Sequence, residues 1–284
     1  MRKIDLGKTG EQIPVLGQGT WGIVGGKRVE WYDQWKASLR KGIELGMTHI
    51  DTAEAYGFGA SEKVVGEIIK EYGRDELFIT SKLLPLHITK KSMEKAIDKT
   101  LQLLGIPTLD LFLIHWPNPL IPTKKHIRIM ESFVKAGKTR YIGVSNFSVK
   151  RFKVAQQAVS NTEIVNNQIH INIAQQGHVG KSLPYYQKEG VTVSAWSPLG
   201  HSGFKNLKEP LKSTLEKVAQ AHDVTIHQIA IAWVVSFKNV FTIPKAFKTE
   251  HVEANAAAAE IQLSEAEMHE LTECKEFELA SFDA

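Results

Sequence analysis

Short apolar runs separated by helical stretches constrain the fold of this chain more than any other feature. Seven of these runs are rich in Ile, Val, Leu and Thr and mostly apolar throughout: Thr48–Asp51, Leu77–Ser81, Leu109–Ile114, Thr139–Val144, Ile164–Asn167, Val191–Ala195 and Val240–Ile243. Strands have this pattern when both of their faces are buried, as in a parallel sheet. A similar run near Val15–Gly19 brings the expected number of strands to eight.

Helix signals lie between these runs. Thr225 and Gln228 have the spacing of a capping box ahead of the apolar-periodic stretch Ile226–Phe237. Ser264 and Glu267 have the same spacing at the start of the last expected helix. Five glycines stand just before a run, where a helix has to end in a left-handed residue: Gly46, Gly73, Gly105, Gly137 and Gly190.

The repeated order of helix, glycine and strand predicts an α/β fold with a parallel sheet and crossover helices. Eight such units favour a single (β/α)8 TIM barrel, with extra helices at its C-terminal end. The segment Met1–Pro14, with a turn at residues 7–10, predicts a short N-terminal β-hairpin. A doubly wound open sheet stays the alternative, because periodicity alone does not separate the two. The chain has 284 residues and no linker, so we expect one domain over residues 1–284.

Charge and composition exclude several classes of function. The net charge is +4 and the basic residues are scattered, which disfavours a nucleic-acid partner. The N-terminus lacks the apolar core of a signal peptide, no stretch is long enough to span a bilayer, and Cys274 is the only cysteine. We therefore expect a cytoplasmic protein without a membrane partner, either a monomer or a weak oligomer. No His-x-His or His-Glu-x-x-His spacing predicts a metal, which disfavours a metal-dependent barrel hydrolase.

A polar or ring-bearing residue stands at the end of seven of the expected strands: Asp51, Lys82, His115, Asn146, Gln168, Trp196 and Lys245. Barrel active sites assemble at the carboxyl ends of the strands, so these residues are expected to meet at one face. Tyr56 follows Asp51 by five residues. A phenol, with a pKa near 10, needs a neighbouring cation to act as an acid at neutral pH. Lys82 can supply that cation.

Purely structural roles for these residues stay open at this point. Buried Asp–Lys pairs are often purely structural, and a histidine in an apolar run is often a hydrogen-bonded core residue. The motifs are more specific, and they occur in order from residue 4 to about residue 272: Gly17–Trp21, Asp51–Gly57, Lys82, Asp110–Pro117, Arg140–Phe147, Asn167-Gln168, Trp196–Gly200 and Ile243–Lys245. Together they resemble the signatures of the aldo-keto reductases, which reduce aldehydes and ketones reversibly to alcohols with NAD(P)H.

The resemblance implies a catalytic tetrad of Tyr56 as general acid, Lys82 paired with Asp51 to tune its pKa, and His115 to position the carbonyl. It implies that Ser145, Asn146 and Gln168 bind the nicotinamide carboxamide. Ser197 and Leu199 would lie along the pyrophosphate. The remaining implied cofactor contacts are Gly19, Thr20, Trp21, Asp51, Trp196, Gly200, Ile243, Lys245, Ala246, Lys248, His251 and Asn255. The implied substrate-binding residues are Trp21, Tyr56, Phe58, His115 and Trp116.

The sequence departs from the family pattern at the cofactor. Trp196 stands where a tyrosine usually stacks on the nicotinamide, and an indole can stack as well. His251 replaces the arginine that usually grips the 2′-phosphate, and Ala246 and Ala254 replace a serine and a glutamate. Histidine is mostly neutral above pH 6.5, so phosphate recognition is weakened. We expect NADP(H) ahead of NAD(H), with NAD(H) or dual use left open.

Other features bear on substrate choice and on the alternatives. A short tail after Leu271 and a short loop at residues 118–123 predict an open site with broad specificity. Gly17–Gly22 spells the dinucleotide fingerprint of a lactate-type dehydrogenase, but Trp35–Leu45 has a helical pattern where a second strand should follow. A nucleotide-sensing or channel-associated subunit with slow turnover is the other alternative. The intact tetrad speaks against loss of chemistry, but not against such a role.

Overall fold

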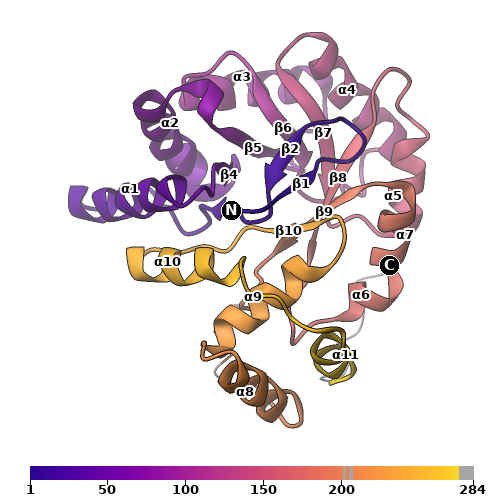
Figure 1. Cartoon of the computed structure of the whole chain (residues 1–284). Coiled ribbons are helices and arrows are strands. Elements are labelled where there is room, and N and C mark those ends of the chain that lie inside the picture. Colours follow the sequence, from indigo (N-terminus) through magenta and orange to yellow (C-terminus); the bar gives the residue numbers. More distant parts are fainter. Residues whose placement is uncertain (201–202, 205–206, 275–284) are drawn as a thin grey trace.

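Eight parallel strands form one sheet, in the order in which they occur along the chain. The computed structural model describes residues 1–200, 203–204 and 207–274 (Figure 1). The strands of this sheet are β3 (Gln18–Gly19), β4 (His49–Asp51), β5 (Phe78–Leu83), β6 (Leu109–Ile114), β7 (Thr139–Ser145), β8 (Ile164–His170), β9 (Thr192–Trp196) and β10 (Val240–Thr242). The open doubly wound sheet is thereby excluded, because such a sheet reverses its strand order part-way.

The sheet closes on itself through the segment before β3. Leu16 pairs in parallel with Thr242 of β10. The Gly17 backbone N donates to Thr242 O at 2.8 Å, and Thr242 N donates to Val15 O at 3.1 Å. The predicted strand Val15–Gly19 is thus divided: its first part pairs with β10 and only Gln18–Gly19 pairs with β4. The predicted (β/α)8 barrel is confirmed.

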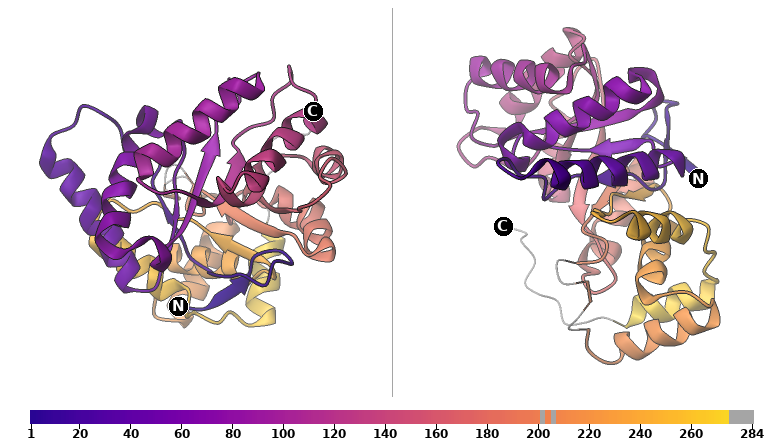
Figure 2. Two further views of the ribbon diagram at one scale, coloured as in Figure 1. Left: turned by 90° about the horizontal axis from the view of Figure 1, so that it is seen from above. Right: turned by 90° about the vertical axis from the view of Figure 1, so that its left-hand side faces the viewer.

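Helices surround the barrel (Figure 2). Those that follow the strands in turn are α1 (Val29–Glu44), α2 (Ala60–Tyr72), α3 (Lys90–Leu104), α4 (Thr123–Lys135), α5 (Val149–Gln156), α6 (Gly177–Lys181), α7 (Leu183–Glu189), α9 (Ile226–Ser236) and α10 (Thr249–Ala258). Two further helices, α8 (Leu211–Ala221) and α11 (Glu265–Glu273), lie together beside α9 (Figure 1). Short 3₁₀ turns occupy η1 (Tyr56–Gly59) and η2 (Arg74–Glu76). The extra C-terminal helices are as predicted.

The predicted local signals are present in the structure. Both capping boxes form, at Thr225 before α9 and at Ser264 before α11. The five glycines expected at helix ends all have a positive φ, between 67° and 95°. The helix expected at Trp35–Leu45 is present but begins six residues earlier, at Val29. No described helix is both long and apolar enough to cross a membrane.

The N-terminal hairpin covers one end of the barrel (Figure 1). Its strands β1 (Lys3–Asp5) and β2 (Gln12–Pro14) pair antiparallel. Leu6 and Ile13 are fully buried against barrel residues such as Leu111 and Phe241. Since this closes the end from which the strands start, the polar residues at the carboxyl ends face the open end.

Candidate active site

Three neighbouring strands bring the predicted proton-transfer residues onto one face of the barrel wall. Asp51 at the end of β4 pairs with Thr80, and Lys82 lies two residues further along β5. Lys82 in turn pairs with Leu113, and His115 lies two residues beyond it, just after β6. Because side chains alternate along a strand, steps of two keep all three side chains on the inner face. The register between neighbouring strands therefore brings these three side chains together.

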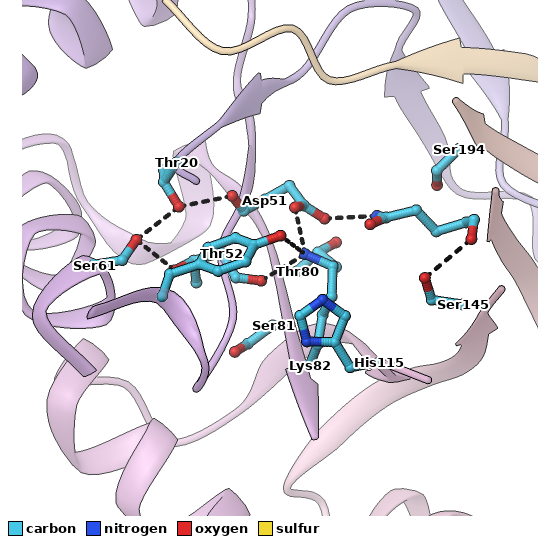
Figure 3. Close-up of polar contacts among 12 residues, drawn as sticks. Thr20, Asp51, Thr52, Ser61, Thr80, Ser81, Lys82, His115, Ser145 and Ser194 are labelled. Atoms are coloured by element: carbon cyan, nitrogen blue, oxygen red, sulfur yellow. Dashed lines mark hydrogen bonds and ion pairs between the residues drawn. The ribbon is translucent and has the colours of Figure 1, made fainter. Parts of the chain in front are cut away.

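Lys82 Nζ is the centre of the cluster (Figure 3). It donates to Asp51 Oδ1 at 2.5 Å, to the Thr52 carbonyl oxygen at 2.9 Å and to Tyr56 OH at 3.2 Å. The second carboxylate oxygen of Asp51 accepts from Gln168 Nε2 at 2.8 Å. An ammonium group has three hydrogens, and all three are used here.

The protonation states of Lys82 and Tyr56 follow from these contacts. Burial alone would lower the pKa of Lys82, but attraction by Asp51 and Tyr56 outweighs it, so the pKa of Lys82 is raised above its ordinary value. Burial also raises the pKa of the Tyr56 phenol, a rise that Lys82 opposes. Tyr56 is therefore protonated at neutral pH, as a proton donor has to be.

His115 is a neutral imidazole in this site. Burial, helped by the positive charge of Lys82, lowers the pKa of His115 to about 3. Its Nδ1 is buried and no described residue contacts it with a hydrogen bond, whereas Nε2 is not enclosed in this way. A buried N–H without an acceptor is rare and costly, so the ring proton belongs on Nε2. The ring packs edge-on to Tyr56, with centroids 5.8 Å apart.

A second group of amide side chains lies beside the first. Asn146 follows β7 in a left-handed conformation (φ 60°). Its Nδ2 donates to the His115 carbonyl oxygen at 3.2 Å and to Ser145 Oγ at 2.9 Å, while its Oδ1 accepts from Trp196 Nε1 at 3.1 Å. Ser145 Oγ donates to the Gln168 carbonyl oxygen at 3.0 Å. The strand ends β7, β8 and β9 are thus joined to the Lys82 cluster through Gln168.

Comparison with known proteins identifies the family. The model of the Aldo/keto reductase family matches residues 15–276. The chain belongs to the aldo-keto reductase family. As such it is an oxidoreductase that transfers hydride between a nicotinamide cofactor and a carbonyl compound.

Relatives of this aldo-keto reductase match it over nearly its whole length. It is 35% identical over 258 residues to methylglyoxal reductase YeaE from Escherichia coli (strain K12), covering 90% of this chain and 89% of that protein. The thermostable aldo-keto reductase Tm1743, solved with the inhibitor epalrestat, superimposes with a TM-score of 0.91 at 42% identity, over 96% of this chain and 99% of that one. A Klebsiella pneumoniae aldo/keto reductase solved with NADP and acetate has a TM-score of 0.82 and 35% identity, over 94% of this chain and 93% of that one.

The polar groups of the reductase fit a nicotinamide carboxamide. No described donor contacts Gln168 Oε1, although Gln168 Nε2 is held by Asp51, so this oxygen can accept from a ligand amide. The Trp196 indole is fixed at its edge by Asn146 and at one face by His170, whose ring is stacked on it at 4.0 Å and 10°. An indole held in this way at the end of β9 can stack on a planar ring.

A second set of predicted cofactor residues lies apart from the tetrad, at the start of α10. Lys245, Lys248 and His251 are exposed, and Asn255 is buried further along the helix. Among the described residues, no side chain caps the first turn of α10. Free backbone N–H groups and lysines at a helix N-terminus suit a phosphate. The other predicted cofactor residues lie at the carboxyl edge of the barrel: Gly19, Thr20, Ser197, Leu199, Gly200, Ile243 and Ala246.

Apolar side chains are exposed on the segments that follow β3, β4, β5 and β6. The three predicted from the sequence are strongly exposed, at 54% for Trp21, 89% for Phe58 and 47% for Trp116. Leu86 and Leu120, on the loops after β5 and β6, are 79% and 80% exposed and were not predicted. Large apolar side chains exposed at the same end of the barrel are candidates for a binding surface.

His170 was also missed by the sequence analysis. It lies beside Trp196 in the register of β8 and β9, which explains the stacking. The signal was available, since His170 follows Gln168 by two residues and so shares its face of the strand. The predicted short tail after Leu271 falls mostly on residues 275–284, outside the described residues.

Proposed function

We propose that Tyr56 is the general acid of carbonyl reduction in this aldo-keto reductase, and the base of alcohol oxidation. The observation that carries this role is the position of Lys82 Nζ, which lies 2.5 Å from Asp51 Oδ1 and 3.2 Å from Tyr56 OH. When Tyr56 gives up its proton, the phenolate forms beside a buried ammonium that Asp51 keeps protonated. Opposite charge at this range favours the ionised form of the acid.

The bound nicotinamide supplies the hydride that reaches the carbonyl carbon. The chain supplies the proton: it passes from Tyr56 OH to the carbonyl oxygen, which becomes the hydroxyl of the alcohol. Neutral His115 donates a hydrogen bond from Nε2 to the same oxygen and so holds it at Tyr56. Positioning of this kind is the protein's main contribution to the rate.

The cofactor is NADPH in preference to NADH under this proposal. Ser145, Asn146 and Gln168 hold the carboxamide, and the Trp196 indole stacks on the ring. Lys245 and Lys248 receive the 2′-phosphate. NADP in the Klebsiella pneumoniae structure supports this choice. His251 weakens it, because a neutral imidazole lacks the forked charge of arginine.

The proposed substrates are aldehydes and ketones with an apolar body. The exposure of Trp21, Phe58 and Trp116 supports an open, apolar site with broad specificity. Methylglyoxal, named for the Escherichia coli relative, belongs in the first panel of compounds. Strict selectivity for one aldehyde in such a panel would contradict an open site.

The first experiment measures the oxidation of NADPH and of NADH with aromatic and aliphatic aldehydes and with methylglyoxal. The wild-type protein is expected to turn over with several of them. Tyr56→Phe is expected to lose turnover by a factor of about 10² or more, the usual contribution of a general acid, while NADPH still quenches tryptophan fluorescence. A fully active Tyr56→Phe variant would refute the role of Tyr56. Tight cofactor binding without turnover in the wild type would favour a nucleotide-sensing subunit.

The remaining proposals concern the whole protein. We propose one domain over residues 1–284, a monomer or weak oligomer, and residence in the cytoplasm. A single cooperative unfolding transition, the mass in solution and cell fractionation test these three statements in turn.

A further inference from the structure

Three fully buried hydroxyl groups form a chain beside the proposed tetrad (Figure 3). Thr52 Oγ1 lies 2.8 Å from Ser61 Oγ, and Ser61 Oγ lies 2.7 Å from Thr20 Oγ1. Thr20 Oγ1 then reaches the Asp51 carbonyl oxygen at 2.9 Å. The three residues come from the end of β4, the start of α2 and the end of β3.

The direction of this chain follows from the number of hydrogens. A carbonyl oxygen only accepts, so Thr20 donates its single hydroxyl hydrogen to Asp51 O. Ser61 must then donate to Thr20, which leaves Thr52 to donate to Ser61. Every hydrogen bond is fixed, and the chain runs from Thr52 through Ser61 and Thr20 back to residue 51. Buried networks that are fully satisfied in this way are rigid.

The chain of hydroxyl groups holds Asp51 and Thr52, the two residues that supply two of the acceptors of Lys82 Nζ. Asp51 O accepts from both Thr20 N at 3.1 Å and Thr20 Oγ1 at 2.9 Å. The Asp51 carboxylate and the Thr52 carbonyl oxygen are two of the three acceptors of Lys82 Nζ. The hydrogen bonds of the hydroxyl groups therefore hold the backbone of Asp51 and Thr52 in place.

The same chain closes the loop that carries Tyr56. This loop runs from Thr52 to Ser61, so the hydrogen bond between the two hydroxyls joins its ends. Within it, Phe58 has a left-handed conformation (φ 52°), which a non-glycine residue rarely adopts. Such a loop keeps its shape only if its surroundings hold it.

We propose that Thr52 and Ser61 are positioning residues of the reductase, which hold Lys82 and the Tyr56 loop in register for proton transfer. The inference rests on the proposed role of Tyr56. Both hydroxyls are fully buried, so neither touches substrate or cofactor. Their loss is therefore expected to slow the chemical step while binding is kept.

The test compares Thr52→Val with Thr52→Ser. The Thr52 hydroxyl heads the chain, so removing it leaves no buried hydroxyl hydrogen without an acceptor, and valine keeps the shape of threonine. We measure the single-turnover rate of hydride transfer from NADPH to a good aldehyde, the KM for that aldehyde and the Kd for NADPH. Thr52→Val should lower the rate about tenfold and leave KM and Kd within about twofold, because small displacements at a reacting centre cost rate rather than binding. Thr52→Ser should restore the rate.

Ser61→Ala removes the middle hydroxyl group and leaves the Thr52 hydroxyl hydrogen without an acceptor. The single-turnover rate of this variant should therefore fall at least as far as that of Thr52→Val. An unchanged rate in Thr52→Val, or a loss that Thr52→Ser does not restore, would overturn the inference. A loss of NADPH binding in step with the rate would overturn it too, since that is the mark of general damage. Wild type and Tyr56→Phe are assayed alongside: a fully active Tyr56→Phe would refute the role of Tyr56 itself.

Discussion

Lys82 is a fully buried cation, and the residues around it explain how the barrel tolerates one. A buried ammonium without partners would lose its proton or destabilise the fold by several kcal/mol. Here one carboxylate, one carbonyl and one phenol use all three of its hydrogens. The third partner is the phenol, on which negative charge would develop when Tyr56 gives up its proton in the proposed mechanism. Under the proposed function, this buried ion pair serves the proton transfer.

Under the proposed function, His251 is expected to set how strongly the reductase prefers NADPH. It is exposed in the first turn of α10, near Lys248. His251→Arg should raise the ratio of kcat/KM for NADPH over NADH by about tenfold or more, because a charge-assisted hydrogen bond contributes about 1.5–3 kcal/mol. His251→Gln serves as the uncharged control and should leave the ratio near that of the wild type. An unchanged ratio in the arginine variant would show that the 2′-phosphate is bound elsewhere.

At the scale of elements, α9 shows how a helix signal and burial act together. Residues Ile229–Val235 of this helix are all buried, so it has no polar face to mark it as amphipathic. Its start is instead fixed by a capping box, in which Thr225 Oγ1 accepts from Gln228 N at 3.3 Å and Gln228 Oε1 accepts from Thr225 N at 3.1 Å. The cap satisfies backbone groups that the apolar helix cannot satisfy otherwise.

Removal of this cap is expected to destabilise the fold without touching the site. Thr225→Ala should lower the free energy of unfolding by about 1 kcal/mol, the usual cost of a lost N-cap. Urea titration followed by circular dichroism measures the loss, and Thr225→Ser, which keeps the hydroxyl, should recover most of it. Equal stability of the alanine variant would mean that the cap is replaced by solvent at no cost.

At the scale of the whole molecule, three buried histidines link stability to pH. Burial lowers the pKa of His49 to about 3, that of His115 to about 3 and that of His126 to about 4. Below pH 6.5 the unfolded chain takes up protons on these residues that the folded chain does not, so unfolding is favoured. Above pH 6.5 the three histidines are neutral in both the folded and the unfolded chain. As the pH falls from 6.5 towards 4, only the unfolded chain takes up protons on them, and the free energy of unfolding falls.

The free energy of unfolding should therefore fall between pH 7.5 and pH 5.5. Where a histidine is protonated in the unfolded chain and neutral in the folded chain, the free energy of unfolding falls by about 1.4 kcal/mol per pH unit for that histidine. Urea unfolding at the two pH values measures the fall. His126→Phe removes one of the three groups and should reduce the pH-dependent loss by about a third, whatever its effect on absolute stability. Equal stability of the wild-type protein at both pH values would contradict the prediction.

Local signals in the sequence determined the elements of this protein. Apolar runs, capping boxes and glycines act over a few residues, so most strands, two helix starts and five helix ends followed from them. The start of α1 at Val29 and the division of the strand Val15–Gly19 did not. The polar residues at the strand ends also followed, because the carboxyl ends of parallel strands meet by geometry. The convergence of Asp51, Lys82 and His115 on one face was therefore predictable from the order of residues along the chain.

The tertiary structure alone decided how these residues are connected. Strand register set Lys82 two residues beyond the partner of Asp51, and it set His170 against Trp196. The hydroxyl chain joins Thr20, Thr52 and Ser61, which lie up to 41 residues apart, with hydrogen bonds that have no local pattern. Thr and Ser occur throughout any sequence, so only the closed barrel, with its exclusion of water, turns these three into a fixed network. Local interactions specify elements, whereas burial and register specify partners.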